Sequence, residues 1–222
     1  MNIKNNIIKH YLKDCYFING TAYAGKSTMC KLLAEKYDLI LCGENYGLDR
    51  MLEMINPQEQ PNLSYFKTMK DWQEFVNRTP DEYLAWIEGN AREAADFEVA
   101  ELIRLSAGKK TIVDTNIPME VLKEIAEYNQ VAIMLSPQAM SVDMFFERED
   151  EEKQFLLSEI KKCADPDKTM RNFRDCIAAV NSPQTYDRWR NSGFFTIVRE
   201  DTENDTRIET LDTLARHFGL CP

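Results

Sequence analysis

The stretch Cys15–Ser27, with the sequence CYFINGTAYAGKS, decides the fold of this chain. Its first part, Cys15–Asn19, is an apolar run with the composition of a buried β-strand. From Gly20 to Ser27 the residues follow the pattern G-x-x-x-x-G-K-S/T, and a helical pattern begins at Lys26. A strand, a turn bounded by glycines and a helix therefore follow one another directly.

This pattern is typical of a loop that holds phosphate groups. Glycines let backbone N–H groups curve around phosphate oxygens, and the N-terminus of the following helix adds positive potential. We expect Lys26 to reach the β- and γ-phosphates of a nucleoside triphosphate, and the Ser27 hydroxyl to ligate Mg²⁺. An ordinary strand–turn–helix corner with a surface lysine is the alternative. The residues expected to bind the triphosphate are Gly20, Thr21, Ala22, Tyr23, Ala24, Gly25, Lys26, Ser27 and Thr28.

Four further apolar runs predict the rest of a sheet. They are Leu39–Cys42, Thr111–Val113, Val131–Leu135 and Phe194–Val198. Because these runs are nearly continuous, they suit strands that are covered on both faces, as in parallel sheets. Helical patterns alternate with them at Lys26–Tyr37, Pro80–Ser106, a short segment opened by Pro118, and about Thr206–Phe218. The alternation predicts an α/β fold, a parallel sheet of about five strands with helices on both faces.

Two long intervals without strands, about 48–107 and about 141–191, interrupt this alternation. The sequence contains no internal repeat, low-complexity tract or Gly/Ser linker that would separate them from the rest. We therefore expect one domain, 1–222, in which both intervals are helical insertions.

The loop Gly20–Ser27 resembles that of the P-loop NTPase superfamily, and the order of elements is similar to its small-molecule and nucleotide kinase branch. The resemblance implies a P-loop kinase-like domain that binds ATP with Mg²⁺. It also implies that 48–107 lies on the acceptor side and that 141–191 forms a lid-like region. A switch GTPase would carry a base-reading N/T-K-x-D tetrapeptide after the fourth strand, where this chain reads Leu135-Ser136-Pro137-Gln138. The GTPase branch is therefore disfavoured.

Asp114 follows the apolar run Thr111–Val113 and precedes Thr115 and Asn116. A carboxylate at the C-terminal end of a parallel strand lies where ligands collect in open α/β sheets. We therefore expect Asp114 and Ser27 to bracket the metal, as in a Walker B arrangement. The Asp-Thr-Asn triplet also resembles that of polynucleotide-kinase-like and zeta-toxin-like P-loop kinases. The alternative is an aspartate that only caps the helix opened by Pro118.

Glu44 comes just after the second predicted strand, in the stretch CGENY. In related small kinases an acid at this position often deprotonates the substrate hydroxyl, so the resemblance implies that Glu44 is the general base. The chain contains 37 acidic residues, and an ordinary surface acid is the alternative.

The segment 161–190 carries more basic than acidic residues, although the whole chain has a net charge of −10. Arg171 and Arg174 are three residues apart and would share one face of a helix. Together with Arg148, they are candidates to close over the triphosphate and to stabilise charge in the transition state. A solvated, charge-laced helix is the alternative.

The net charge opposes a broad grip on nucleic acid or on an anionic membrane surface. No apolar run approaches the roughly 20 residues of a membrane span, and the polar start of the chain lacks a signal-peptide core. The six cysteines form no CxxC pair, which favours reduced thiols and a cytoplasmic protein.

The hypothesis that best fits these patterns is an ATP-dependent kinase of a small molecule, such as a nucleoside or a nucleotide. The partners would then be a nucleoside triphosphate and a small acceptor. A P-loop ATPase or a nucleotide-binding regulator without an acceptor is the alternative, and a polynucleotide 5′-kinase is disfavoured by the negative charge. Core packing is expected for most aromatic residues of the first insertion, with one or two available to stack on a base or sugar.

Overall fold

Five parallel strands form one sheet in the computed structural model, which describes residues 3–147, 151–199 and 204–221. The spatial order is β2-β3-β1-β4-β5. The strands are β1 (Cys15–Gly20), β2 (Ile40–Cys42), β3 (Thr111–Asp114), β4 (Val131–Leu135) and β5 (Phe195–Val198). The predicted α/β fold is confirmed, and each strand starts and ends within one residue of the apolar run that predicted it.

The central strand β1 shows why apolar runs without polar alternation were the right signal. Cys15 and Phe17 point into one core of buried residues, whereas Tyr16 and Ile18 point into another core on the opposite face of the sheet. Both faces are thus shielded from water. Parallel pairing places Ile18 beside Asp114, so the ends of β1 and β3 meet at the same edge.

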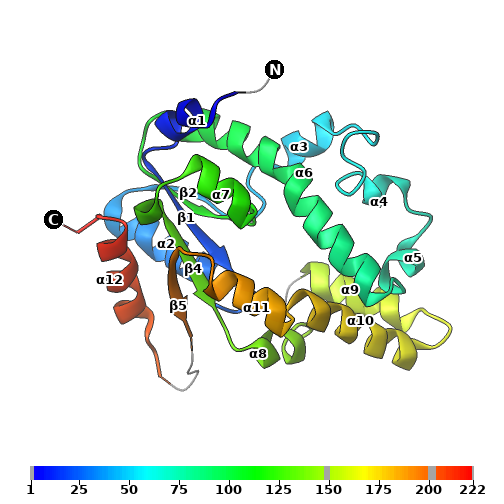
Figure 1. Ribbon diagram of the computed structural model, residues 1–222. Helices are drawn as coiled ribbons and strands as arrows, with labels where there is room; N and C mark the ends of the chain where they lie inside the picture. Colours follow the sequence, from blue (N-terminus) through cyan, green and yellow to red (C-terminus); the bar gives the residue numbers. More distant parts are fainter. Residues whose placement is uncertain (1–2, 148–150, 200–203, 222) are drawn as a thin grey trace.

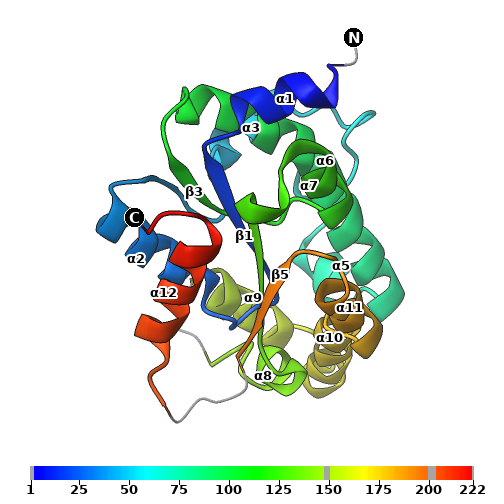
Figure 2. The same ribbon diagram turned by 60° about the vertical axis from the view of Figure 1, so that its left-hand side comes forward.

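Helices cover both faces of the sheet (Figures 1 and 2). The helices α2 (Lys26–Tyr37) and α12 (Arg207–His217) pack on one face around Leu33 and Leu214. On the other face lie α1 (Asn5–Tyr11), α6 (Pro80–Ser106), α7 (Met119–Ile125) and α11 (Pro183–Arg190). The helix α7 begins one residue after Pro118, which is its N-cap.

The two strandless intervals are helical, as predicted. The first contains α3 (Leu48–Met54), α4 (Tyr65–Thr68), α5 (Trp72–Val76) and α6. The second contains α8 (Gln138–Asp143), α9 (Glu151–Lys161), α10 (Pro166–Val180) and α11, and a short 3-10 turn at Tyr128–Gln130 precedes β4. The two intervals pack against each other, α6 on α10 and α5 on α9, around a third core that contains Phe75 and Phe173.

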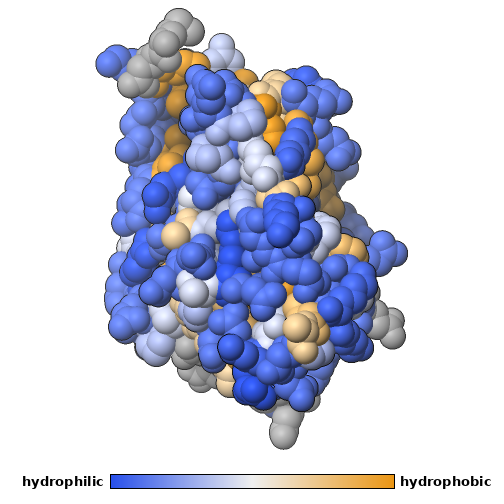
Figure 3. All heavy atoms as spheres, turned by 90° about the vertical axis from the view of Figure 1, so that its right-hand side faces the viewer, coloured by the Kyte–Doolittle hydropathy of each residue, from blue (hydrophilic) through white to orange (hydrophobic). Residues whose placement is uncertain are grey.

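The outer surface of these helical insertions is mainly hydrophilic and carries smaller hydrophobic patches (Figure 3). The aromatic residues Phe75, Tyr83 and Trp86 are buried beneath it, which agrees with the core-packing expectation. Among the described helices, none has both the length and the apolar character that crossing a membrane requires. Each described cysteine is a free thiol.

Gly20 is the position at which the backbone tolerates no side chain. Its φ is +131°, and a Cβ atom there would overlap the backbone carbonyl of Met134 on β4. We expect Gly20→Ala to lower the free energy of unfolding by about 3 kcal/mol or more, because neither backbone can move without disturbing the sheet. Urea unfolding followed by circular dichroism measures this loss.

The matched control is Gly43→Ala, since a Cβ atom at Gly43 would meet no heavy atom within 4 Å among the described residues. Its unfolding free energy should stay within about 0.5 kcal/mol of the wild type. Equal stability of the Gly20 and Gly43 variants would contradict this account of the loop.

Candidate functional site

The loop between β1 and α2 has the backbone conformation of an anion-binding loop. Gly20 and Gly25 have φ values of +131° and +89°, and Tyr23 between them has a left-handed φ of +63°. The amide of Thr21 donates to the Met134 carbonyl oxygen at 3.0 Å, which ties the loop to β4. Gly25 is the N-cap of α2, and no described side chain caps this helix. The first N–H groups of α2 therefore face the loop.

Lys26 places its ammonium group over this loop. Its Nζ donates to the carbonyl oxygen of Thr21 at 3.1 Å and to that of Gly20 at 3.4 Å. Every residue from Gly20 to Thr28 lines the large cavity described below. A cation and the positive end of a helix thus converge on one concave surface.

The structure brings the two predicted metal ligands together. Ser27 Oγ donates to Asp114 Oδ2 at 2.5 Å, and Asp114 is only 1% exposed. The other oxygen, Asp114 Oδ1, has no hydrogen-bond partner in the part of the chain that the structure describes. Among these same residues, no side chain caps α7, so Asp114 is not its helix cap.

Burial raises the pKa of Asp114, although the Ser27 hydrogen bond and the charge of Lys26 lower it and the charge of Glu44 raises it further. A divalent cation beside Oδ1 would satisfy this oxygen and favour the charged carboxylate. The described residues include no cluster of three or more acidic, histidine or cysteine ligands. The donors that are present, one buried carboxylate and one hydroxyl, suit Mg²⁺, which takes one or two carboxylates and completes its shell with water and substrate phosphates.

The side chains of the two residues that follow Asp114 each contact a glutamate carboxyl group. Thr115 Oγ1 donates to Glu98 Oε2 at 2.9 Å, and Asn116 Nδ2 lies 3.5 Å from Glu44 Oε1. Three consecutive side chains at the end of β3 therefore contact α2, α6 and the loop after β2. Glu44 is exposed and lines the same cavity as the loop Gly20–Ser27, and its role as a general base stays a prediction.

Glu98 is a site residue that the sequence analysis missed. It lies on α6, and Tyr46 Oη lies 3.4 Å from its Oε2 and 3.2 Å from its backbone oxygen. Burial raises the pKa of Glu98 from 4.5 to about 7, although the hydrogen bonds from Thr115 and Tyr46 lower it in part. The available signal was a charged residue in register with Ala91, Ala95 and Leu102 on the apolar stripe of the helix.

A cavity of about 660 Å³ extends from the loop Gly20–Ser27 between α6, the start of α7 and the end of the α10–α11 segment. In Figure 1, α11 and the N-terminal half of α6 lie on the side of the carboxyl ends of β1 and β4, and α6 runs back from there toward α1. Aromatic side chains from both helices line this cavity, and they are Tyr83, Trp86, Tyr186 and Trp189. Its volume is in the range of sites for small molecules.

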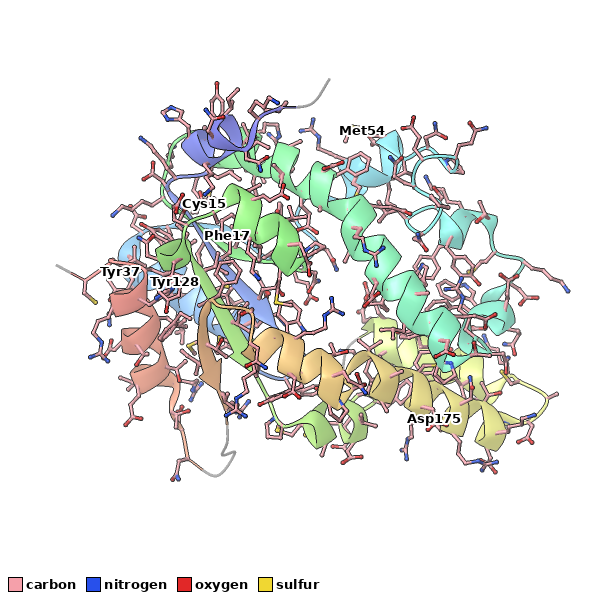
Figure 4. The ribbon with its side chains drawn as sticks, in the orientation of Figure 1. Cys15, Phe17, Tyr37, Met54, Tyr128 and Asp175 are labelled. Atoms are coloured by element: carbon pink, nitrogen blue, oxygen red, sulfur yellow. The ribbon has the colours of Figure 1, made fainter. Side chains whose placement is uncertain are left out.

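Two of the three predicted arginines, Arg171 and Arg174, lie away from the described cavity. Arg171 and Arg174 do share α10, but both are exposed, and neither belongs to the described residues that line the cavity. The opposite face of α10 is buried through Phe173 and its neighbours, which turns the arginines to solvent. Figure 4 shows the adjacent Asp175 pointing outwards. Arg148 lies outside the described residues.

Other residues that sequence reasoning missed brace the loop from the neighbouring strands. Ser136, directly after β4, donates from Oγ to the Ala22 carbonyl oxygen at 2.6 Å, and its amide donates to Thr21 Oγ1 at 2.8 Å. Arg199, directly after β5, donates to the Tyr23 carbonyl oxygen at 3.1 Å. Both positions follow strand ends at the edge that carries the loop, which is the signal that could have identified them.

The sheet order β2-β3-β1-β4-β5, with all strands parallel, is consistent with P-loop-like folds. Comparison with protein-family models gives no match to this sequence, and comparison with curated proteins gives no significant match. The likeness therefore rests on the strand order and on the loop that joins β1 to α2.

The raised pKa of Glu98 makes stability depend on pH. Between its ordinary value of 4.5 and about 7 the folded state binds more protons than the unfolded state, so stability falls as the pH rises. Glu98→Gln removes the cost of ionising a buried carboxyl group, because glutamine stays neutral at every pH. We expect the stability of the variant relative to wild type to rise by up to about 3 kcal/mol between about pH 5 and about pH 8.

Urea unfolding of both proteins at the two pH values measures this change. The control is Glu101→Gln on the same helix, because Arg104 lowers the pKa of Glu101 and its charged form therefore stabilises the folded state. Its stability relative to the wild type should therefore change little between about pH 5 and about pH 8, because Glu101 is already charged in both the folded and the unfolded state there. A relative stability of Glu98→Gln that does not change with pH would show that the Glu98 carboxyl is not held as described.

Proposed function

We propose that this protein is an ATP-dependent kinase that transfers the γ-phosphoryl group to a small molecule, with a P-loop kinase-like domain. The observation that carries the proposal is the Ser27–Asp114 hydrogen bond. It joins the N-terminal turn of the helix after the phosphate loop to the acid of β3, beside a cavity that contains further carboxylates. This combination is what phosphoryl transfer from a nucleoside triphosphate needs.

In this proposal the loop Gly20–Gly25 and the N-terminus of α2 hold the phosphates through backbone N–H groups. Lys26 exchanges its carbonyl partners for the β- and γ-phosphate oxygens. Ser27 and Asp114 hold Mg²⁺, and the unpaired Asp114 Oδ1 supports this assignment. When bound, Mg²⁺ supplies positive charge that offsets the charge of the phosphates.

The proposed step is an in-line displacement at the γ-phosphorus. The acceptor hydroxyl oxygen forms a bond to phosphorus while the bond to the β,γ-bridging oxygen breaks, and ADP leaves. The hydroxyl proton passes to Glu44, the proposed base, whose Oε1 is 3.5 Å from Asn116 Nδ2. Asn116 orients this carboxylate from the same strand end that holds Asp114.

An ATPase without an acceptor remains the second candidate function, and the walls of the cavity separate the two. The cavity of about 660 Å³ runs along the loop Gly20–Ser27, where the triphosphate would bind, and extends beyond this loop to α6 and α11. Its aromatic and polar walls favour an organic acceptor over water.

ADP formation, measured with and without a panel of nucleosides, nucleotides, sugars and short oligonucleotides, tests the proposal. We expect one class of acceptor to stimulate turnover. Lys26→Ala should abolish turnover because the charge that faces the phosphates is lost, and Lys31→Ala, on the exposed side of the same helix, should leave it unchanged. Glu44→Gln should lower only the acceptor-stimulated part, by about 100-fold or more.

ADP formation that proceeds at one rate with every acceptor, and that survives Glu44→Gln, would reject the kinase in favour of the ATPase. Full activity of Lys26→Ala would reject both functions, since each depends on the phosphate loop.

A further inference from the structure

The cations on the outer wall of the cavity are already paired with acids of the same wall. Arg92 Nη2 lies 3.2 Å from one oxygen of Glu88, and Arg188 Nη1 lies 3.2 Å from the other. Arg188 Nη2 is also 3.9 Å from Glu120 Oε1. These ion pairs are solvent-exposed and individually weak, and they leave the outer wall with two guanidinium groups balanced by two carboxylates.

Two further lysines reach the cavity. Lys26 lies over the phosphate loop, where the proposed function commits it to the triphosphate. Lys153 comes from α9, and its Nζ lies 5.3 Å from the ring centroid of Phe145. The described cavity thus offers an acceptor phosphate no preformed cluster of arginines like those that commonly hold such groups.

At the inner end, beside the phosphate loop, the cavity presents carboxylates instead. Glu44 and Glu98 both line it there, next to Asn116. Both groups can accept hydrogen bonds from hydroxyl groups, and the Glu44 carboxylate repels an acceptor phosphate, whereas the raised pKa of Glu98 leaves that group partly neutral near pH 7. The end of the cavity where the transfer would occur is therefore suited to an acceptor with more than one hydroxyl group.

Glu98 is held in a fixed orientation for such a contact. Thr115 Oγ1 donates to its Oε2 at 2.9 Å, and Tyr46 Oη lies 3.4 Å from the same oxygen. Within the described ranges both contacts end on Oε2, and Oε1 is the oxygen that can accept from an acceptor hydroxyl. A carboxylate anchored through one oxygen loses little further freedom when a ligand binds to the other.

The side walls favour a flat ring. Tyr83 and Trp86 line the cavity from α6, and Tyr186 and Trp189 line it from α11. The indole Nε1 of Trp86 donates to the Asn62 carbonyl oxygen at 3.1 Å, which fixes the orientation of that ring. Because Tyr83 and Trp86 also pack in the third core, the half-buried rings of Tyr186 and Trp189 are the ones that offer stacking surfaces to a planar ligand.

We propose that the acceptor is an uncharged molecule that combines a flat ring with several hydroxyl groups, a nucleoside in chemical class, and that Glu98 binds one of its hydroxyls. A phosphorylated acceptor such as a nucleoside monophosphate is disfavoured by the same charges. This inference rests on the proposed function, because it names the acceptor of that reaction.

Isothermal titration calorimetry with the common ribonucleosides and their 5′-monophosphates tests the proposal. The titrations are made in the presence of Mg²⁺ and a non-hydrolysable ATP analogue, so that the triphosphate site is filled. We expect at least one nucleoside to bind about 10-fold or more tightly than its own monophosphate. Tighter or equal binding of the monophosphates, or no nucleoside binding at millimolar concentration, would overturn the proposal.

Variants on α6 show whether Glu98 contributes to nucleoside binding. Glu98→Gln should weaken nucleoside binding about 10-fold and leave the affinity for the ATP analogue unchanged. Glu101→Gln, one turn further along and paired with Arg104, should leave both affinities unchanged. Nucleoside affinity that survives Glu98→Gln in a folded protein would remove Glu98 from the site.

A second variant tests the preference for an uncharged acceptor without altering Glu98, and it can be used if Glu98→Gln does not fold. Glu88→Gln removes the shared partner of Arg92 and Arg188, so the ratio of nucleoside to monophosphate affinity should fall. An unchanged ratio would show that the paired arginines do not set the preference.

Binding and phosphorylation fail separately in this design. A nucleoside that binds and is not phosphorylated would reject the kinase while the ligand class stands. Phosphorylation of a monophosphate in preference to every nucleoside would support the kinase and reject the ligand class.

Discussion

The hydrogen bond between Ser27 and Asp114 is the contact on which the rest of the site depends. The two residues are 87 positions apart in the chain, and they meet because β1 and β3 are parallel neighbours with Ile18 beside Asp114. Parallel strands bring their carboxyl ends to one edge of the sheet. The loop Gly20–Ser27, the buried Asp114 and the cavity therefore lie together as a consequence of the parallel topology.

Two buried carboxyl groups at the carboxyl edge of the sheet link the fold to the proposed chemistry. Burial raises the pKa of Asp114 and of Glu98, so the protein holds two carboxyl groups in surroundings that disfavour their charge. A metal ion beside Asp114 and a hydroxyl donor beside Glu98 would each relieve that cost. Buried carboxyl groups with raised pKa values are typical of functional sites, and they lower the stability of the folded state.

Local patterns predicted the sheet and the main helices, because apolar runs and caps are encoded over short distances. The helix α6 spans Pro80–Ser106 as predicted, and Thr79 and Glu82 form its capping box. Tertiary contacts decided the rest. The spacing of Arg171 and Arg174 predicted a shared face, but only the packing of α10 on α6 shows that this face is turned to solvent. Glu98 and the helix α1 were missed because their partners lie far along the chain.

The central proposal is that Asp114 holds Mg²⁺. Its most direct test compares how far Mg²⁺ strengthens ATP binding in the wild type and in Asp114→Asn. Calorimetric titrations with ATP, with and without Mg²⁺, give the affinity that the metal adds in each protein. We expect Mg²⁺ to strengthen ATP binding about 10-fold or more in the wild type and to add almost nothing in the variant. Metal-free affinity should be similar in both. An equal gain from Mg²⁺ in the variant would show that Asp114 does not hold the metal.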